Sequence, residues 1–589
     1  MSNLDLVTDK VAGQIQSRVD LWESGVSSFL EKNDEYAKTF KLDPPDAKKN
    51  TSGFTRTRVA ETTRATMALA TSMYRMATAN DPLFDLASLD GLPEELESMR
   101  LYKTSSLLLW QLMKLKYKRN LFKAFQGVSL FGTQVVEESW KSWPPGSATP
   151  LWEGLEFLPI SLLQFAFDPN STTMEQSDYH TKLDYITPSK LRRLSKFDPN
   201  TWDQHAVDEA IEQNKNQQGI PARVRERRER AGYTSGEPVL ELMTQYGPCD
   251  DLEEFDGIEP VITLVNGTKA VRAHGNPFPG AQRPFRIGHY IEFELEPYGL
   301  GVGRLGHLSQ RQLDGNRNRT SDLITASLLN QWLVARASGI NPSQFRFKPN
   351  GVIEGDDISE NSLRPLRPLI EAAQYGMQLD RMAKDELRGS TGAVPNLLAI
   401  AEDSPATNAS IAQNEALKRV AVPAGILADE FIREHLMMMH KSNHQWLDRE
   451  IMVAVMGQAP TRVSKRNMVM DAEFFVKVAT DRDSQPNRVS TLQQLLAILT
   501  SIRNKLPIDD EAVVDLIREI YRSQGINPAR VVLKAPPSII DRLSASQSAA
   551  QGQAEGAPDI TPAPSAMAPM EVSQDQIANL PAGLTELTP

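Results

Sequence analysis

In residues 1–131, apolar side chains recur mostly at the three- and four-residue spacing of α-helices. The pattern predicts polar-interrupted helices up to about residue 80, the first over about Leu6–Lys32, and then one helix over about Glu97–Phe131. After Gly132, the stretch TQVVEESWK alternates enough to indicate a strand, and WPPGS ends that strand as a turn. The first part of the chain is therefore expected to be helical, with its first strand near residue 133.

Between about residues 150 and 300, the pattern changes to short β-type runs bounded by Pro, Gly and Asn. These runs are LEFLPI, FAFDPN, PVLELMTQY, PVITLVNGTKAVRA and FRIGHYIEFELE. Thr187 followed by Pro188 predicts a helix start, because Thr caps a helix and Pro fits its first position. The polar insert at about Glu212–Glu237 contains RVRERRER, whose mixed charges favour a solvated helix or mobile loop over a nucleic-acid patch.

After residue 300 the chain is predicted to be mainly helical again. A polar helix is expected over Leu305–Ala337, followed by a short β-loop segment and by a second helix from Pro368 to near Gly389. Apolar residues form one stripe of this second helix: Ala372, Tyr375, Leu379 and Met382.

The last part of the chain begins with the loop GSTGAVPNLLAIAEDSPATN. A long helical region is predicted over about Asn408–Val455, kinked or broken at Pro423. MDAEFFVKVATD indicates one more strand, and two helices are expected near 490–503 and 509–523. After about Ser544, a composition rich in Ala, Pro, Gln, Ser and Gly indicates disorder.

Composition and charge narrow the functional classes. A chain of 589 residues is too long for one core, so two or more packed regions are expected. The net charge of −11 argues against a protein that coats nucleic acid by bulk electrostatics. The single cysteine, Cys249, cannot form an internal disulfide, and a reducing cytosol is the expected place of synthesis. Neither signal-peptide features at the N-terminus nor an apolar run of ~18 residues is found, so no membrane insertion is expected.

A Gly-x-Gly-x-x-Gly pattern at Gly301, Gly303 and Gly306 suggests a dinucleotide-binding turn. The preceding run YIEFELE alternates apolar residues with carboxylates, whereas the first strand of a dinucleotide fold is buried on both faces. No strand ending in an acid follows at ~20 residues, where a ribose contact is expected. We therefore interpret these glycines, with Gly299, as a structural turn into the polar helix. A β-branched residue in place of Gly303 should disrupt this turn if Gly303 needs positive φ.

No other motif indicates catalysis or metal binding. His440 and His444 share a helix face near His435, but the HExxH glutamate and a third ligand are missing, so an amphipathic surface helix is favoured over zinc. Neither a GxxxxGK[ST] loop nor a GxSxG motif occurs. The sequence therefore predicts no enzyme, no metal site and no cofactor.

The polar first half of the helix after residue 304 is either solvent-bridging or packed against copies of itself. With its neighbours, it resembles the portal, or head-to-tail connector, proteins of short-tailed bacteriophages. The similar motifs, in order, are FAFDPN, YITPSKLRRL, PYGLGVGRLGHLSQRQLDGNRNR and SPATNASIAQNEALKRV. Together they make the resemblance cover about residues 100–525.

The resemblance implies an α+β, mainly helical subunit of a ring, usually of twelve copies, at one capsid vertex. The implied parts are an N-terminal wing (1–304), stem helices (305–337 and 368–388) around a small β-containing clip (338–367), a channel or tunnel loop (389–407), the kinked helix and strand of the wing (408–483), crown helices (484–543) and a disordered tail (544–589).

The resemblance also implies that double-stranded DNA is packaged and ejected through the ring without catalysis by this chain. Implied partners are further copies of the chain, the terminase large subunit, a head-completion or tail adaptor protein, the major capsid protein and the scaffold. The implied location is the virion, after synthesis in the bacterial cytoplasm.

Few cations on the channel wall would guide DNA without holding it, because each firm phosphate contact must be broken again. Candidate channel residues are Arg311, Arg317, Arg319, Val394, Asn396 and Leu397. For Arg317, a salt bridge between subunits is an equal alternative. The alternative functions are a dinucleotide-dependent oxidoreductase and another virion structural protein.

Overall fold

The computed structural model describes sixteen stretches of the chain: residues 6–45, 55–79, 82–91, 93–144, 147, 150–198, 201–215, 220, 222–233, 239–294, 296–328, 331–334, 363–366, 371–392, 418–454 and 460–476. All of them lie in the first of two compact units, Met1–Thr491. The predicted crown, tail and helices after residue 490 lie outside the described residues, as do most of the clip and the channel loop after Gly392.

Four helices form the N-terminal part of the described fold: α1 (Asp9–Lys41), α2 (Glu61–Ala77), α3 (Glu94–Lys114) and α4 (Tyr117–Phe131). The prediction of one helix over Glu97–Phe131 is wrong, because Lys116 has left-handed backbone geometry with a φ of 54° and separates α3 from α4. This break places Tyr117 in the core, where its hydroxyl donates to the carbonyl oxygen of Phe431 at 2.8 Å.

A three-stranded antiparallel sheet in the order β3-β2-β9 lies at the centre, built from β2 (Thr133–Trp143), β3 (Trp152–Ile160) and β9 (Phe285–His289). The prediction of a strand through YIEFELE is wrong beyond His289. That residue pairs with Thr133, the first residue of β2, so the segment after it has no partner strand there. Ile291 and Phe293 are exposed as a result.

The second sheet is antiparallel and five-stranded, in the order β4-β5-β6-β7-β8. Its strands are β4 (Phe165–Phe167), β5 (His180–Ile186), β6 (Leu240–Tyr246), β7 (Pro260–Val265) and β8 (Lys269–Gly275). The sequence pattern indicated all of these strands except β5. Helix α5 (Pro188–Phe197) begins at Thr187 and Pro188 as predicted, and α6 (Gln204–Lys215) packs with it.

Helix α7 (Ala222–Arg230) contains the charged run RVRERRER. The prediction of a solvated segment is wrong for Arg227, which is only 4% exposed. Its guanidinium donates to Glu241 at 2.9 and 3.0 Å and to Asp20 at 3.0 Å. The charge is buried because α1 and β6 supply carboxylates from distant parts of the chain.

Two hydrophobic cores lie on the two sides of the three-stranded sheet. The adjacent β2 residues Val135 and Val136 belong to different cores, as expected for side chains that alternate along a strand. Val136 packs with α2, α4 and the long helix, and Val135 packs with α1 and the five-stranded sheet. The core that contains Val136 also holds the base of the helix pair described next, through Val302 and Leu387.

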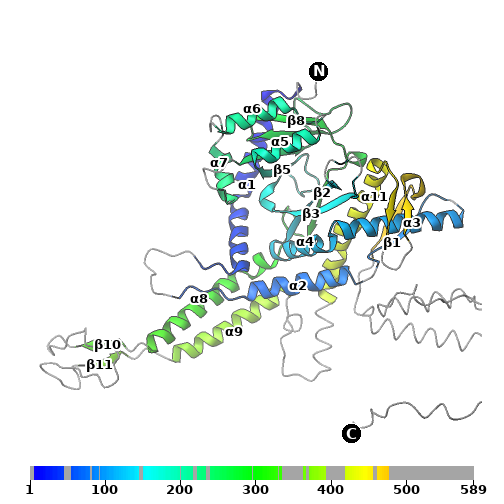
Figure 1. Cartoon of the computed structure of the whole chain (residues 1–589). Coiled ribbons are helices and arrows are strands. Elements are labelled where there is room, and N and C mark those ends of the chain that lie inside the picture. Colours follow the sequence, from blue (N-terminus) through cyan, green and yellow to red (C-terminus); the bar gives the residue numbers. More distant parts are fainter. Residues whose placement is uncertain are drawn as a thin grey trace, which may run out of the picture. The chain divides into compact units, whose positions relative to one another are not determined.

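Helices α8 (Val302–Leu328) and α9 (Glu371–Thr391) lie side by side and extend away from the sheets, with β10 (Gln331–Val334) and β11 (Leu363–Leu366) beyond them (Figure 1). The helix predicted over Leu305–Ala337 is therefore wrong beyond Leu328, because 331–334 form a strand paired with β11.

The long helix runs through residues 418–446, with a π-helical turn, η6 (Asp429–Arg433), before α11 (Glu434–Trp446). The described part is not broken at Pro423, so only the alternative of a kink there stays a prediction. The predicted end near Val455 is wrong, because the helix ends nine residues earlier, at Trp446. The chain after it forms β12 (Ile451–Val453), β13 (Thr461–Val463) and β14 (Ala472–Phe475), the last of which pairs with β1 (Asp85–Ser88) and confirms the predicted strand in MDAEFF. Short 3-10 turns are η2 (Leu162–Gln164), η3 (Pro279–Ala281) and η7 (Lys465–Asn467).

Candidate functional site: the projecting helix pair

The glycine-rich turn before α8 is packed against the chain itself. A Cβ on Gly301 would lie 2.6 Å from the carbonyl oxygen of Leu130 and still closer to the backbone of Gly132. A Cβ on Gly303 would lie 2.7 Å from Cγ of Tyr36. These glycines are required by close approach of two backbones and of an aromatic ring.

Positive φ is not the reason for these glycines, because none of Gly299, Gly301, Gly303 and Gly306 has it. The dinucleotide interpretation fails for a related reason. Gly132, Leu130 and Tyr36 occupy the space in which a pyrophosphate would have to lie, and the preceding strand β9 is antiparallel to its neighbour.

One side of α8 is covered by residues 55–62 of the same chain, which we call the strap: a non-helical segment, 55–60, followed by the first two residues of α2. Four polar side chains at four-residue spacing accept hydrogen bonds from strap backbone N–H groups: Gln310 from Thr62 (3.1 Å), Asp314 from Val59 (2.8 Å), Asn318 from Thr57 (3.0 Å) and Asp322 from Thr55 (2.8 Å). Gln310 and Asn318 also donate back to strap carbonyls. Because residues four apart share a helix face, the four side chains form a ladder along α8.

On this side of α8, polar side chains are covered by the same chain and not by a neighbouring copy, so the prediction of burial between copies is wrong for the ladder residues. Gln310 and Asp314 are 2% and 7% exposed within one chain. Burial raises the pKa of Asp314, and its bonds to Val59 and Gln310 oppose this. The four-residue spacing of Gln, Asp, Asn and Asp was visible in the sequence, but nothing local indicated which segment would cover it.

Close contacts join α8 to α9. A Cβ on Gly376 would overlap the hydroxyl of Thr320, and one on Gly306 would lie 3.1 Å from Cγ of Leu387. Leu313 is fully buried. At the base of the pair, Arg388 of α9 donates to the buried carboxylate of Glu61 on α2 at 2.6 Å.

The predicted channel arginines, Arg311, Arg317 and Arg319, all lie on α8 and are exposed. Arg317 forms an ion pair with Asp380 of α9 in the same chain, with 3.0 Å between Nε and Oδ2. The other predicted channel residues, Val394, Asn396 and Leu397, lie outside the described residues. The structure thus brings the three arginines onto one helix and leaves their part in a channel as a prediction.

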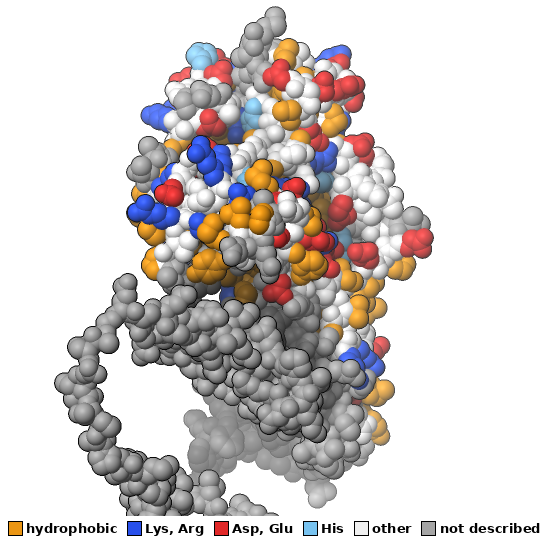
Figure 2. Space-filling view, turned by 90° about the vertical axis from the view of Figure 1, so that its right-hand side faces the viewer, with side chains coloured by type: hydrophobic (Ala, Val, Ile, Leu, Met, Phe, Trp, Pro, Cys, Tyr) orange, Lys and Arg blue, Asp and Glu red, His pale blue; other side chains and the backbone are white. Residues whose placement is uncertain are grey.

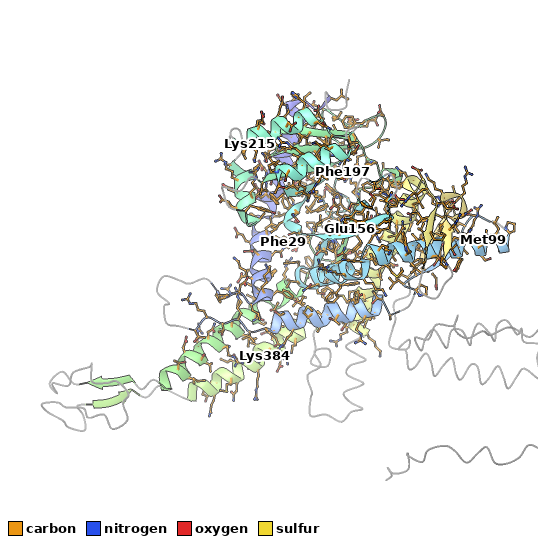
Figure 3. All side chains as sticks on the ribbon, in the orientation of Figure 1. Phe29, Met99, Glu156, Phe197, Lys215 and Lys384 are labelled. Carbon is orange, nitrogen blue, oxygen red and sulfur yellow. The ribbon has the colours of Figure 1, made fainter. Side chains whose placement is uncertain are left out.

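An apolar stripe runs along the outer side of α9. Tyr375 and Met382 are each 67% exposed and Leu379 is 42% exposed, at the spacing of one helix face. Figure 3 shows the side chains of this pair, including the labelled Lys384, standing clear of the sheets. Within the described part of the chain, the stripe has no covering element.

The histidines of the long helix are structural. His435 shares a 2.7 Å hydrogen bond with Glu138, and both side chains are fully buried. His440 and His444 bond to the carbonyl oxygens of Met470 and Val469. The expected surface helix is therefore wrong, because α11 is largely buried. In the described stretches no group of three or more His, Cys, Asp or Glu residues is arranged to hold a metal ion.

None of the helices within the described stretches combines the length and the apolar composition needed to cross a membrane.

Comparison with protein families completes the evidence for this chain. The family model described as Phage SU10 portal protein matches residues 154–578, which include the five-stranded sheet and the helix pair. The chain belongs to the phage SU10 portal protein family. No match is found among curated proteins. Membership of the portal family confirms the resemblance inferred from the ordered motifs and supports a structural role in the phage particle.

Proposed function

We propose that this portal-family chain assembles into a closed ring, of about twelve copies in keeping with the family resemblance, around a channel for double-stranded DNA at one capsid vertex. The helix pair α8–α9 would form the stem, β10–β11 the start of the clip, and residues before α8 together with the long helix the wing. The ring would contain no catalytic centre and would dock a separate packaging motor and later a tail adaptor.

The observation that carries this proposal is the exposed apolar stripe of α9. Its members, Tyr375, Leu379 and Met382, continue one face of a helix that projects away from both cores. Large apolar side chains in a contiguous exposed row indicate an interface. Copies related by rotation would cover this stripe with the next helix pair and close into a ring.

The exposed arginines of α8 fit weak guidance of DNA. Arg311 and Arg319 have no carboxylate partner among the described residues, whereas Arg317 is partly neutralised by Asp380. A sparse set of cations in an acidic protein gives few phosphate contacts, and such contacts weaken steeply with salt. The chain would therefore let DNA slide rather than hold it.

Electron microscopy of the purified chain tests this proposal. We expect closed rings with a central hole wide enough for duplex DNA. The variant Tyr375→Ser with Met382→Ser should shift the protein to monomers, while the matched variant Gln378→Ser, an exposed polar position on the same helix, should still form rings. If the unaltered chain is only monomeric at micromolar concentration, the portal proposal is wrong.

A further inference from the structure

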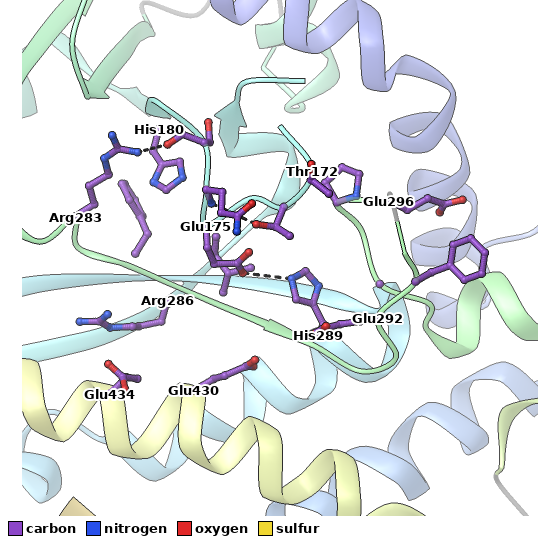
Figure 4. Close-up of a pocket in the computed structure, with 18 of the residues that line it drawn as sticks. Thr172, Glu175, His180, Arg283, Arg286, His289, Glu292, Glu296, Glu430 and Glu434 are labelled. Atoms are coloured by element: carbon purple, nitrogen blue, oxygen red, sulfur yellow. Dashed lines mark hydrogen bonds and ion pairs between the residues drawn. The ribbon is translucent and has the colours of Figure 1, made fainter. Parts of the chain in front are cut away.

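A cavity of about 1020 Å³ lies along β9, beside the loops at 172–177 and 292–299 and the π-helical turn of the long helix. Figure 4 shows Glu175, Glu292, Glu430 and Glu434 approaching it from three segments of the chain. We call five of its lining residues the acidic rim: Glu175, Glu292, Glu294, Glu430 and Glu434.

Only part of the rim is paired with cations. Glu434 lies 3.4 Å from Nη2 of Arg433, and Nη2 of Arg286 is buried without a hydrogen-bond partner in the described structure. The two arginines that line the cavity, Arg283 and Arg286, bond to Glu259 and Glu138, which lie outside its lining. Oε1 of Glu175 lies 3.4 Å from Nε2 of His289. For Glu292, Glu294 and Glu430, no cation within ion-pair distance occurs in the described parts of the chain. Glu292 and Glu294 therefore carry negative charge that one copy of the chain does not neutralise.

Two buried acceptor atoms at this cavity also lack donors. Oε2 of Glu430 is buried without a hydrogen-bond partner in the described structure. Burial, followed by the charges of Glu175 and Glu292, raises the pKa of Glu430 to about 8. His180 is 5% exposed, and its Nε2 bonds to the carbonyl oxygen of Met174, so Nε2 carries the hydrogen and the unpartnered Nδ1 is an acceptor. Nδ1 of His180 therefore calls for an incoming donor. Glu430 is mostly protonated at neutral pH, so it offers a buried polar group and not a negative charge.

A second surface has the opposite charge. Five cations occur within ten residues where α3 passes into α4, and we call them the basic ridge: Lys114, Lys116, Lys118, Arg119 and Lys123. All five are exposed, and in the described structure none has a carboxylate within ion-pair distance. Such a cluster is conspicuous in a chain of net charge −11.

The ridge and the rim lie at opposite edges of the three-stranded sheet. Asn120 at the start of α4 donates to the carbonyl oxygen of Phe157 in β3, which places the ridge at the β3 edge. The cavity is lined by Phe285, Arg286, Ile287 and His289 of β9, the strand at the other edge. On the face drawn in Figure 2, Lys and Arg are more frequent towards the left side and Asp and Glu towards the right.

We infer that, in the assembly, the basic ridge of one copy of this chain docks into the acidic rim of the next copy. This inference rests on the proposed ring, because two complementary surfaces on opposite flanks make a head-to-tail contact that rotation can close. Apolar residues accompany both charges: Ile291 and Phe293 are exposed between the rim glutamates, and Met113 is exposed beside the ridge. Complementary charge sets the register and the rate of such a contact.

Zero-length carbodiimide cross-linking tests the contact directly. Equal amounts of ¹⁵N-labelled and unlabelled chain are mixed before assembly, so that each ring contains both. Cross-linking of these rings should give amide bonds between ridge lysines, such as Lys118 or Lys123, and rim glutamates, such as Glu292 or Glu294. These peptides should pair one labelled and one unlabelled partner in about half of the cases, as random mixing requires. Cross-links that always join peptides of the same isotope, or no ridge-to-rim cross-link in intact rings, would overturn the inference.

Charge reversal gives a second test. The variants Lys118→Glu with Arg119→Glu, and Glu292→Lys with Glu294→Lys, should each raise the concentration for half-assembly at least about tenfold, and the chain with all four changes should regain assembly. The control pairs Lys190→Glu with Arg193→Glu, and Glu253→Lys with Glu254→Lys, alter exposed charges elsewhere and should assemble normally.

The outcomes separate the two proposals. Rings from both reversed variants at the unaltered concentration would disprove the ridge-to-rim pairing and leave the portal proposal intact. Absence of rings from the unaltered chain would disprove the portal proposal itself. Circular dichroism of each variant as a monomer checks that the substitutions on these exposed surfaces leave the fold unchanged.

Discussion

Helices α7 and α9 differ in burial from what their sequences predict: a charged side chain of α7 is buried, and apolar side chains of α9 are exposed. α7 has seven charged residues in RVRERRER, yet its Arg227 is buried among three carboxylates. α9 has the apolar stripe of a helix that packs on a core, yet Tyr375 and Met382 are exposed. The first helix lies against α1 and β6 of its own chain, and the second projects away from both cores.

The difference shows that a side chain's burial depends on what covers it. For α7, the cover is present in the same chain, so a charge run is buried through paired carboxylates. For the outer face of α9, the described chain offers no cover, so an apolar stripe remains for another molecule. The following substitutions test this contrast, beginning with the largest expected change in unfolding free energy.

Removing Arg227 should be the most destabilising change. Arg227→Ala leaves the fully buried Glu241 without its cation and should lower the unfolding free energy by about 3–5 kcal/mol. Chemical denaturation of the monomeric form measures this, with Glu226→Gln, an exposed neighbour, as the control. A loss below about 1 kcal/mol would mean that the buried network contributes no more than a surface ion pair.

The close approach at the glycine turn should give the next largest effect. Gly301→Ala places a Cβ against the backbone of Leu130 and Gly132, and overpacking of this kind costs about 1–3 kcal/mol. Gly315→Ala is the matched control: it lies within α8 with nothing within 4 Å of its added Cβ, and should stabilise the helix by about 0.5–1 kcal/mol. Equal effects of the two changes would contradict the close-contact account.

The ladder between α8 and the strap should show a gradient from its buried to its exposed end. Asp314→Ala leaves the backbone N–H of Val59 without a partner and should cost about 1–3 kcal/mol, since Asp314 is 7% exposed. Asn318→Ala, where the bonds to Thr57 are solvent-exposed, should cost about 0.5 kcal/mol. Gln312→Ala, an exposed position on the same helix, serves as the control, and a reversed order of the first two losses would refute the gradient.

The apolar stripe should matter least to the monomer. Met382→Gln changes a side chain that is 67% exposed, so the unfolding free energy of the monomer should change by less than about 0.5 kcal/mol. The same variant should weaken assembly in sedimentation experiments. A large loss of monomer stability would show that Met382 is covered within its own chain and would remove the contrast with α7.

The sequence pattern predicted most helices and strands but not where some of them end. The helix expected over Leu305–Ala337 ends at Leu328, and the one expected over Glu97–Phe131 is divided at Lys116. In both places the sequence keeps an apolar pattern, although Lys116 has left-handed backbone geometry and 331–334 form a strand. The strand expected through Ile291–Glu296 failed because β2 begins at Thr133 and offers no further partner. Strand pairing is a property of two segments, so alternation in one of them is insufficient.

The candidate site was predicted in part. The helix pair, its glycine turn and the exposed arginines were expected from the sequence, and family membership followed from four motifs in order. The strap, the acidic rim and the basic ridge were not expected. Most cations of the basic ridge are visible in the sequence as KLKYKR. That they form no ion pair could not be predicted, because this depends on which carboxylates the described fold places near them.

The sequence by itself determined the local elements, because helix and strand periodicity, proline and glycine act within a few residues. It also determined the glycines at the turn into α8 and the four-residue spacing of the ladder. Only the tertiary structure decided what those features contact: Gln310 bonds to Thr62, 248 positions away along the chain, and Arg227 to Asp20, 207 positions away. Such contacts depend on how whole cores pack, so no local pattern encodes which polar face is covered and which apolar face remains open.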